Sequence, residues 1–555
     1  MSRTRGRLAA GITLLLVAGA VAAVAGRQQK FYEDDPLARE VETQDASGVR
    51  DREIVLSYDL LENLFAKRGD RRDIRALDVN TIDEVPDSSW YTNRILARPV
   101  SAEEAVRGPV TAAGPAPGPM TIVRAKPSGI APGFVLRDSA GITWFVQFDA
   151  REYPESATGA TMVANRIFWA LGYWQVENHL AELRQETLSI GDTAVTETPS
   201  GKVRKLDPDD LAKLFKRIAR QPNGAYRMLA SRAIPRTQGG FRYYGTRSDD
   251  PNDIIPHEHR RSLRALKVFG AWTNLVDLKA KNTLDALVEE NGRAVLRHYL
   301  QDVGSTFGTG ALAPREWDEG YEYLYEGSPT WRRLVTFGFY IQPWQTIPYE
   351  EHAAIGRFEG DRFDPTRWKP RVPTVAMLNA RADDNFWAAR RVMAFSDALI
   401  RAVVKAGRYS DPAAESHLAD VLIKRRDKIG RAYLPAVNPL VDPQFDEGGT
   451  LTFRNAAVDA GVAEAPKGGY RAQWLAFENG TGKSDPLGTS ASTGALAITA
   501  PAGLLPTREG SFVRVDVAAV DPPHPSWTAP VQLYFRRTAA GWKLVGLERV
   551  ARLRS

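Results

Sequence analysis

The feature that most constrains the fold is a predicted β-hairpin with acidic residues at both of its ends. Residues 283–300 are rich in strand-forming side chains on both sides of Asn291-Gly292, a strong signal for a tight hairpin turn. Asp277 and Asn282 precede this hairpin, and Asp302 follows it. Because the two ends of an antiparallel hairpin lie side by side, we expect Asp302 to return to the loop that carries Asp277 and Asn282.

These three side chains have the chemistry that phosphoryl transfer requires. One carboxylate must orient the acceptor hydroxyl, while an amide oxygen and a second carboxylate hold Mg²⁺ on the nucleotide phosphates. Asp277 and Asn282, five positions apart, can share one tight loop, and the hairpin can deliver Asp302 beside them. A structural interpretation stays open, in which Asn282 caps a loop and the two aspartates stabilise turns.

Two short motifs in this stretch resemble a known family. Asp277-Leu278-Lys279-x-x-Asn282 resembles the catalytic loop of protein kinases, and Asp302-Val303-Gly304 resembles their metal-binding Asp-Phe-Gly. The surroundings are more similar to atypical kinase-like folds, such as HipA-type toxin kinases, secretory-pathway kinases and inositol-lipid kinases. Residues 80–90 and 256–261 also resemble stretches of an uncharacterised bacterial envelope family.

The resemblance implies a role for each of four residues at the hairpin. Asp277 would orient or deprotonate the acceptor hydroxyl, and Lys279 would neutralise the transferring phosphoryl group. Asn282 and Asp302 would bind Mg²⁺, or Mn²⁺, together with ATP. We therefore expect the catalytic and the metal-binding residues to lie in one cleft.

The nucleotide-binding residues that the resemblance implies depart from the kinase pattern. Gly129 and Gly133, with the backbone between them, would form the phosphate-covering loop, although their spacing is unusual. Gln147 stands where the phosphate-anchoring lysine is expected, and Lys126 at the mouth of the loop is the cation that could replace it. Glu155, near the start of the next helix, is the candidate acidic partner but does not align cleanly.

The resemblance implies an α+β fold with a bilobal kinase-like core. The β-rich small lobe would span 121–240 and the helical large lobe 241–435. An N-terminal extension with a Pro/Gly-rich linker would occupy 27–120. Alternating apolar residues after position 436 predict a C-terminal antiparallel β module over 436–555, which we expect to dock a partner rather than to catalyse.

Residues 1–26 have the pattern of a targeting segment rather than of folded structure. Three arginines within residues 3–7 precede an uncharged run from residue 8 to residue 26, and Ala23-Val24-Ala25 fits the small-residue cleavage rule. The run is just long enough to cross a bilayer as a helix, so a cleaved signal and an inner-membrane anchor at residues 8–26 both stay open. Either would place the rest of the chain outside the cytoplasm, in the periplasm or secreted.

Composition excludes several other classes of protein. The chain has 555 residues and no cysteine, which rules out a disulfide scaffold, a thiolate metal site and a cysteine nucleophile. Its net charge is +6, and three of those charges belong to the predicted targeting segment, so the remainder is too weak to indicate nucleic-acid binding. A hydrophobic content of 43% with 25% charged residues is typical of a globular protein.

Three further motifs are assigned to structure rather than to chemistry. Gly480-Thr481-Gly482-Lys483-Ser484 resembles only the end of a P-loop, in a strand-rich setting. His257 and His259 are expected to be solvated at a helix start, with a metal site as the minority alternative. The basic run 424–426 is expected to form a solvated helix face.

Two functions stay open on the sequence. The first is an extracytoplasmic kinase-like enzyme that transfers a phosphoryl group from a nucleotide to an unknown hydroxyl acceptor. The second is a catalytically silent kinase-like scaffold that binds an envelope protein or polymer, an alternative motivated by Gln147 and by the two additional segments. A structural protein without kinase ancestry would require Asp277, Asn282 and Asp302 to lie far apart.

Overall fold

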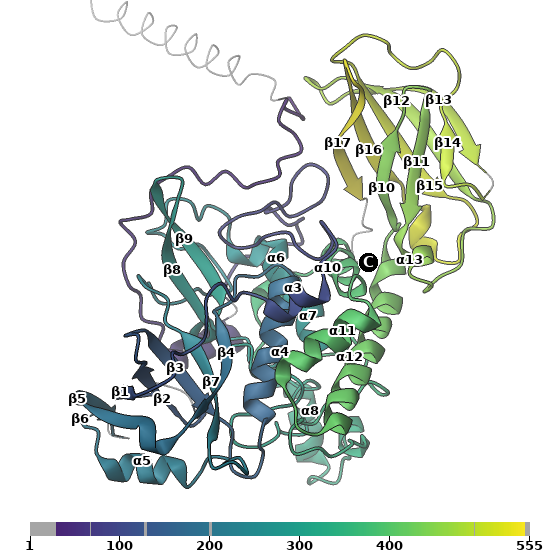
Figure 1. Cartoon of the computed structure of the whole chain (residues 1–555). Helices are drawn as coiled ribbons and strands as arrows, with labels where there is room; N and C mark the ends of the chain where they lie inside the picture. Colours follow the sequence, from purple (N-terminus) through teal and green to yellow (C-terminus); the bar gives the residue numbers. More distant parts are fainter. Residues whose placement is uncertain (1–28, 67, 127–129, 199–201, 493, 550–555) are drawn as a thin grey trace, which may run out of the picture.

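The computed structural model describes most of the chain after the predicted targeting segment, namely residues 29–66, 68–126, 130–198, 202–492 and 494–549. The segment 1–26 and Gly129 lie outside the described residues. Within those ranges no helix is long and apolar enough to cross a membrane. Figure 1 shows a body of sheet and helices, with the C-terminal β module beyond the end of the long helix α12.

A seven-stranded mixed sheet forms one end of the body, in the order β4-β7-β3-β2-β1-β5-β6. Strands β1, β2 and β3 form an antiparallel meander, and β5 pairs with β1 in parallel. The turn at 138–142 connects β2 to β3. The strands are β1 (Met120–Ala125), β2 (Gly133–Arg137), β3 (Thr143–Phe148), β4 (Asn178–Leu183), β5 (Leu188–Glu197), β6 (Val203–Lys205) and β7 (Tyr226–Arg232).

The two faces of this sheet pack against different helices. On one face, alternate residues of β2 and β3 such as Phe134 and Val146 form a core with Phe215 of α5 (Pro208–Phe215). Asp207 caps α5 in a capping box with Asp210. The almost entirely buried helix α4 (Ser156–Ala170) packs against β3, β4 and β7 and also against α11, so it joins the sheet to the helical part.

The helical part is assembled mainly from short helices. Residues 257–273 form a 3₁₀ turn (His257–His259) followed by α6 (Arg261–Arg264) and α7 (Leu266–Thr273). The apolar stripe through 392–403 is also divided, because the Ser396 hydroxyl accepts the Leu399 amide and caps a new helix. The other helices are α8 (Gly327–Val335), α9 (Val375–Leu378), α10 (Ala382–Met393), α11 (Asp397–Val404) and α12 (Pro412–Tyr433).

Much of the segment 29–119, predicted as an extension, packs into the body. Trp90 stacks on His298 with ring centroids 3.6 Å apart, and the Tyr91 hydroxyl donates to the Leu171 carbonyl. Gly172 ends α4 at φ +116°, where a Cβ would lie 2.2 Å from the Tyr91 ring. The segment's short helical pieces are α2 (Leu56–Leu61), η1 (Glu62–Ala66) and α3 (Ala102–Arg107).

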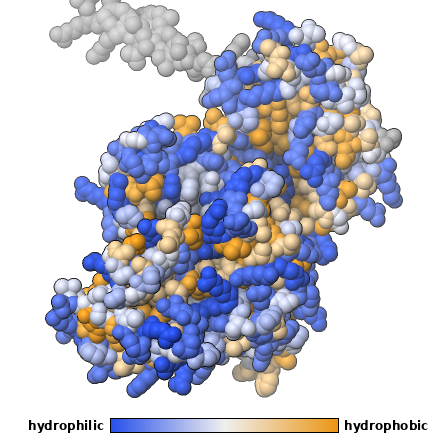
Figure 2. Space-filling view, viewed as in Figure 1, coloured by the Kyte–Doolittle hydropathy of each residue, from blue (hydrophilic) through white to orange (hydrophobic). Residues whose placement is uncertain are grey.

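The C-terminal module consists of two antiparallel sheets, in agreement with the predicted alternation. The smaller has the order β10-β11-β14 and the larger β13-β12-β15-β16-β17. Val513, Val515 and Val517 face its core. Figure 2 shows a mostly hydrophilic surface on this side of the protein, with a broad apolar area on the module. The elements are β10 (Leu440–Phe445), β11 (Thr450–Asn455), α13 (Ala456–Asp459), β12 (Tyr470–Phe477), β13 (Ser484–Ser492), β14 (Ala497–Thr499), β15 (Phe512–Ala519), β16 (Val531–Thr538) and β17 (Gly541–Arg549).

The prediction that His257 and His259 are solvated is wrong. Each is only 1% exposed. His257 Nε2 lies 2.7 Å from Asp253 Oδ2, and His259 Nε2 lies 2.9 Å from Asp70 Oδ2. Polar residues can be buried when carboxylates from other segments pair with them, and the N-terminal segment supplies one of these partners.

The basic run at 424–426 is not a uniformly solvated face either. Arg425 is 3% exposed, and its guanidinium lies 3.9 Å from the ring centroid of Phe363 and 4.4 Å from that of Phe358. Helical periodicity turns its neighbours away, so Lys424 pairs with Asp361 at the surface. A run of like charges on a helix therefore does not occupy one face.

Candidate functional site

The predicted hairpin is confirmed, and it closes on the residues that flank it. β8 (Thr283–Glu290) and β9 (Arg293–Leu300) pair in register through a two-residue turn at Asn291-Gly292, where both residues have positive φ. The backbone amides of Gln301 and Asp302 both donate to the Asn282 carbonyl, at 3.1 and 3.0 Å. The end of the hairpin is thereby fastened to its beginning.

A second hydrogen bond shapes the loop that leads into the hairpin. The side-chain nitrogen of Asn282 donates to the Asp277 carbonyl at 2.9 Å, which closes the loop between them. A 3₁₀ turn (Ala280–Asn282) lies inside it, and the Asp59 carboxylate accepts the Ala280 amide at 3.1 Å. Since the Asn282 nitrogen is engaged, its Oδ1 is the atom left to face a cation.

The Asp277 carboxylate lies between cationic side chains. Lys279 Nζ is 2.7 Å from Asp277 Oδ2, and the Arg315 guanidinium is 3.8 Å from the same oxygen. Burial raises the pKa of Tyr243, and the negative charges of Asp59 and Asp277 add to that rise. The half-buried Asp277 carboxylate is therefore held as a hydrogen-bond acceptor in a polar environment.

Asp302 is exposed at the surface while the two residues that follow it are anchored. Its Oδ1 accepts the Gly304 amide at 3.0 Å, and Val303 is 1% exposed in the main core. A Cβ on Gly304 would lie 2.5 Å from Thr161 Oγ1 on α4. This close approach requires glycine, and it fixes the Asp302 turn against the helix that joins the sheet to the helical part.

Lys126, which follows β1, lies within electrostatic reach of Asp302. Burial lowers the pKa of Lys126, while the charge of Asp302 acts in the opposite direction, so the two side chains lie within electrostatic reach. In the β1–β2 ladder Ala125 pairs with Phe134, and Lys126 is the next residue toward the connecting loop. Gln147 lies half-buried on β3 opposite Gly133. A Cβ added to Gly133 would lie 2.1 Å from the Val146 carbonyl oxygen.

The structure does not bring Glu155 to Lys126. Glu155 adopts φ 66° before α4, and its Oε2 accepts the Ser410 amide at 2.7 Å and the Ser410 hydroxyl at 3.1 Å. Its Oε1 lies 3.7 Å from the Arg227 guanidinium. The helix α4 itself contains no acidic residue, so it offers no carboxylate to a lysine on the sheet.

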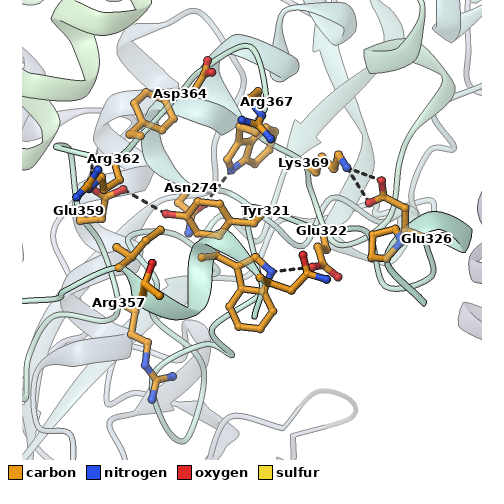
Figure 3. A pocket seen from close by; sticks show the side chains of 18 of the residues that line it. Asn274, Tyr321, Glu322, Glu326, Arg357, Glu359, Arg362, Asp364, Arg367 and Lys369 are labelled. Carbon is orange, nitrogen blue, oxygen red and sulfur yellow. Dashed lines mark hydrogen bonds and ion pairs between the residues drawn. The ribbon is translucent and has the colours of Figure 1, made fainter. Parts of the chain in front are cut away.

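A cavity of about 760 Å³, which no sequence motif indicated, has Asn274 in its lining. Figure 3 shows its charged and aromatic lining: Tyr321 donates to Glu359 at 3.2 Å, and Lys369 lies 2.6 Å from Glu326. Asn274, three residues before Asp277, accepts the Trp368 indole N–H at 2.8 Å. The lining comes from irregular segments around α8 and 340–370, where the density of aromatic and charged residues was the only available signal.

The chain was compared with known proteins. Neither protein-family models nor curated proteins give a match. Among solved structures it is similar to the Golgi casein kinase with Mn and ADP bound, at 11% identity and a TM-score of 0.28, over 71% of this chain and 95% of that one. A second structure of the Golgi casein kinase is 12% identical with a TM-score of 0.29, over 72% of this chain and 96% of that one.

Proposed function

We propose that the protein is a kinase-like phosphotransferase that uses a nucleotide and Mg²⁺ or Mn²⁺ to phosphorylate a hydroxyl group. The observation that carries the proposal is the meeting of Asp277, Asn282 and Asp302 at the base of one hairpin, with Lys126 approaching from the sheet. Asp-x₄-Asn and Asp-x-Gly are each common by chance, but here the in-register hairpin brings the two motifs together. This convergence supports a shared site.

The donor atoms fit a hard divalent cation. The Asn282 side-chain nitrogen donates to the Asp277 carbonyl, so Oδ1 is the side-chain atom that could bind a cation, and Asp302 is exposed with one oxygen occupied by the Gly304 amide. Mg²⁺ and Mn²⁺ prefer oxygen ligands and are commonly held by one or two side chains together with substrate phosphates. A bound cation would neutralise charge on the phosphates. Lys126 would contact the phosphates from the side of the sheet.

The remaining residues would handle the acceptor. The Asp277 carboxylate would accept the hydrogen bond of the acceptor hydroxyl and take its proton as the oxygen bonds to phosphorus, and the nucleoside diphosphate would leave. Lys279 and Arg315 hold that carboxylate in place, and the Lys279 ammonium can also stabilise negative charge on the transferred group. The 760 Å³ cavity next to Asn274 is where an acceptor could be accommodated.

The proposed location is outside the cytoplasm, based on the pattern of residues 1–26. A catalytically silent scaffold is the second candidate. Gln147 on β3 and the absence of an acidic residue on α4 support it, because active kinases use a lysine–glutamate pair in these places. In that case the C-terminal β module would bind an envelope protein or polymer.

Nucleotide binding by the purified protein tests the proposal. Calorimetric titration with ATP should give binding in the presence of Mg²⁺ or Mn²⁺ and little binding with EDTA, because the phosphates and the side chains share the cation. Release of ADP with a hydroxyl-rich acceptor mixture would then separate an active enzyme from a silent scaffold. Absence of binding with ATP, GTP and both cations would contradict the phosphotransferase.

A further inference from the structure

A second group of ligand-type side chains lies outside the hairpin site. Glu350 and His352 belong to the loop after η5 (Pro343–Thr346), and His417 lies on α12, whose first residue follows the cap Asp411. One ligand atom from each of Glu350, His352 and His417 lies within 4.8 Å of the other two. The two imidazoles are almost buried, with 10% and 12% of their side chains exposed, whereas Glu350 is 63% exposed.

The two imidazoles share one pattern of contacts. His352 places Nε2 2.9 Å from Glu350 Oε1, and its Nδ1 lies 3.4 Å from Asp411 Oδ2. His417 places Nδ1 3.1 Å from Glu350 Oε2, and its Nε2 lies 3.3 Å from the Phe358 carbonyl oxygen. Each ring therefore directs one nitrogen toward Glu350 and the other toward a different acceptor.

The contacts of the two rings are compatible with more than one set of tautomers for neutral imidazoles. A neutral histidine has one N–H donor and one nitrogen lone pair. If the outer nitrogens donate to Asp411 and to Phe358, both inner lone pairs face the Glu350 carboxylate. In that arrangement the two nitrogen lone pairs and the anionic carboxylate repel one another, and a cation bound between them removes the repulsion.

We propose that His352 Nε2, His417 Nδ1 and the Glu350 carboxylate bind a divalent transition metal of the zinc class. Two imidazoles and one carboxylate are a common zinc ligand set, with water in the fourth position of the tetrahedron. Zinc–ligand bonds of about 2.0–2.2 Å require ligand atoms about 3.4 Å apart, which small side-chain movements can reach here. Imidazole nitrogens disfavour Mg²⁺ and Ca²⁺, so the site is chemically distinct from the one at Asp302.

The surroundings of the cluster match those of metal-bound histidines. A histidine that ligates a metal usually donates its other ring N–H to a carboxylate or a backbone carbonyl, which orients the ring. Asp411 supplies the carboxylate for His352, and Phe358 supplies the carbonyl for His417. Asp411 is itself held in place, since its Oδ1 accepts the Ala413 amide at the start of α12.

The metal would fasten the loop at 347–358 to the first turns of α12. Tyr349 and Arg357 of this loop line the 760 Å³ cavity. Phe358 of the same loop packs against Phe307, with ring centroids 5.4 Å apart. Phe307 lies three residues after Gly304. The bound metal would therefore hold one wall of the cavity and stabilise the segment that follows Asp302.

The test is zinc binding by the full chain after treatment with EDTA and its removal. Calorimetry should give one Zn²⁺ per chain, and Zn²⁺ should raise the thermal midpoint. Co²⁺ should give the intense visible absorption of a tetrahedral site.

His352→Ala and His417→Ala should each lower the affinity for Zn²⁺ by more than about 100-fold. Asp411→Asn should lower it by about tenfold, since Asp411 only orients a ligand. His524→Ala, which removes a histidine of the C-terminal module, is the matched control and should bind as the unaltered chain does.

Three outcomes would overturn the proposal: no Zn²⁺ binding by the unaltered chain, equal binding by the His352→Ala/His417→Ala double variant, or a Co²⁺ spectrum typical of an octahedral oxygen site. If the histidine variants fail to fold, Glu350→Gln provides the test, because this exposed side chain can be changed without a cavity. Its Zn²⁺ affinity should fall while its circular dichroism stays the same, and unchanged affinity would contradict the assignment. Because Zn²⁺ binding is measured without nucleotide, the result is independent of the proposed phosphotransferase activity.

Discussion

The side-chain nitrogen of Asn282 donates to the backbone carbonyl of Asp277 across 2.9 Å, so one residue of the candidate site holds the other in place. The Asn282 carbonyl in turn accepts the amide of Asp302. A single asparagine thus connects the loop before the hairpin to the turn after it. Loss of its side chain would disturb both the orientation of Asp277 and the supply of oxygen ligands.

Asp302→Ala and Asp277→Asn are predicted to have different effects. Asp302→Ala should abolish metal-dependent nucleotide binding, because Asp302 would be one of two protein ligands to the cation. Asp277→Asn should leave nucleotide affinity within about threefold and stop transfer, since its role is to orient the acceptor. Calorimetry with ATP and Mg²⁺ and an ADP-release assay measure the two quantities. If both variants lose thermal stability by similar amounts with no change in nucleotide response, these aspartates are structural.

Lys126→Met is predicted to weaken nucleotide binding by about 10- to 100-fold. The ammonium group lies within electrostatic reach of Asp302, and charge-assisted contacts to phosphate contribute about 1.5–3 kcal/mol. Titration with ATP and Mg²⁺ measures the loss. Lys483→Met, which removes a largely exposed lysine in the C-terminal module, is the matched control. Equal affinity for ATP in both variants would mean that Lys126 does not take the role of the phosphate-anchoring lysine, which is expected at the position of Gln147.

The sequence predicted those parts of the site that depend on local pattern. The Asn291-Gly292 turn specified the hairpin, and the hairpin placed Asp302 beside Asn282 without any knowledge of the rest of the fold. Each of these predictions needed only residues close together in the sequence.

Interactions between distant segments could not be predicted. The pairing of His259 with Asp70 joins residues 189 positions apart, and Glu155 binds Ser410 across 255 positions. Nothing in the local sequence distinguishes a histidine that will be paired and buried from one that stays solvated. The acidic candidate Glu155, which precedes α4, does not reach Lys126 for this reason, because it accepts from Ser410 in the segment before α12 and pairs with Arg227 on β7.

Gly304→Ala is predicted to destabilise the fold by about 1–3 kcal/mol. The new Cβ would lie 2.5 Å from Thr161 Oγ1, and α4 is packed on both sides so it cannot withdraw freely. Thr161→Ala removes the clashing atom, so the double variant should recover most of the loss beyond the cost of Thr161→Ala alone. Urea unfolding of the four proteins measures the coupling free energy. Strictly additive losses would contradict a direct contact between residues 161 and 304.

The ion pairs of Glu84 are predicted to make stability sensitive to acid. Burial opposes ionisation, but the guanidinium groups of Arg391 and Arg390 at 2.9 and 2.7 Å outweigh it and lower the pKa of Glu84 from 4.5 to about 2. A lowered pKa in the folded state means that the carboxylate stabilises the fold above pH 4.5 and that this contribution, about 3 kcal/mol, is lost as the pH falls toward 2. Glu84→Gln should therefore lower the thermal midpoint at pH 7 and flatten its decline between pH 4.5 and pH 2. Glu509→Gln, at an exposed position, should leave the pH profile unchanged. Parallel profiles for Glu84→Gln and the unaltered chain would show that the pairing does not control acid stability.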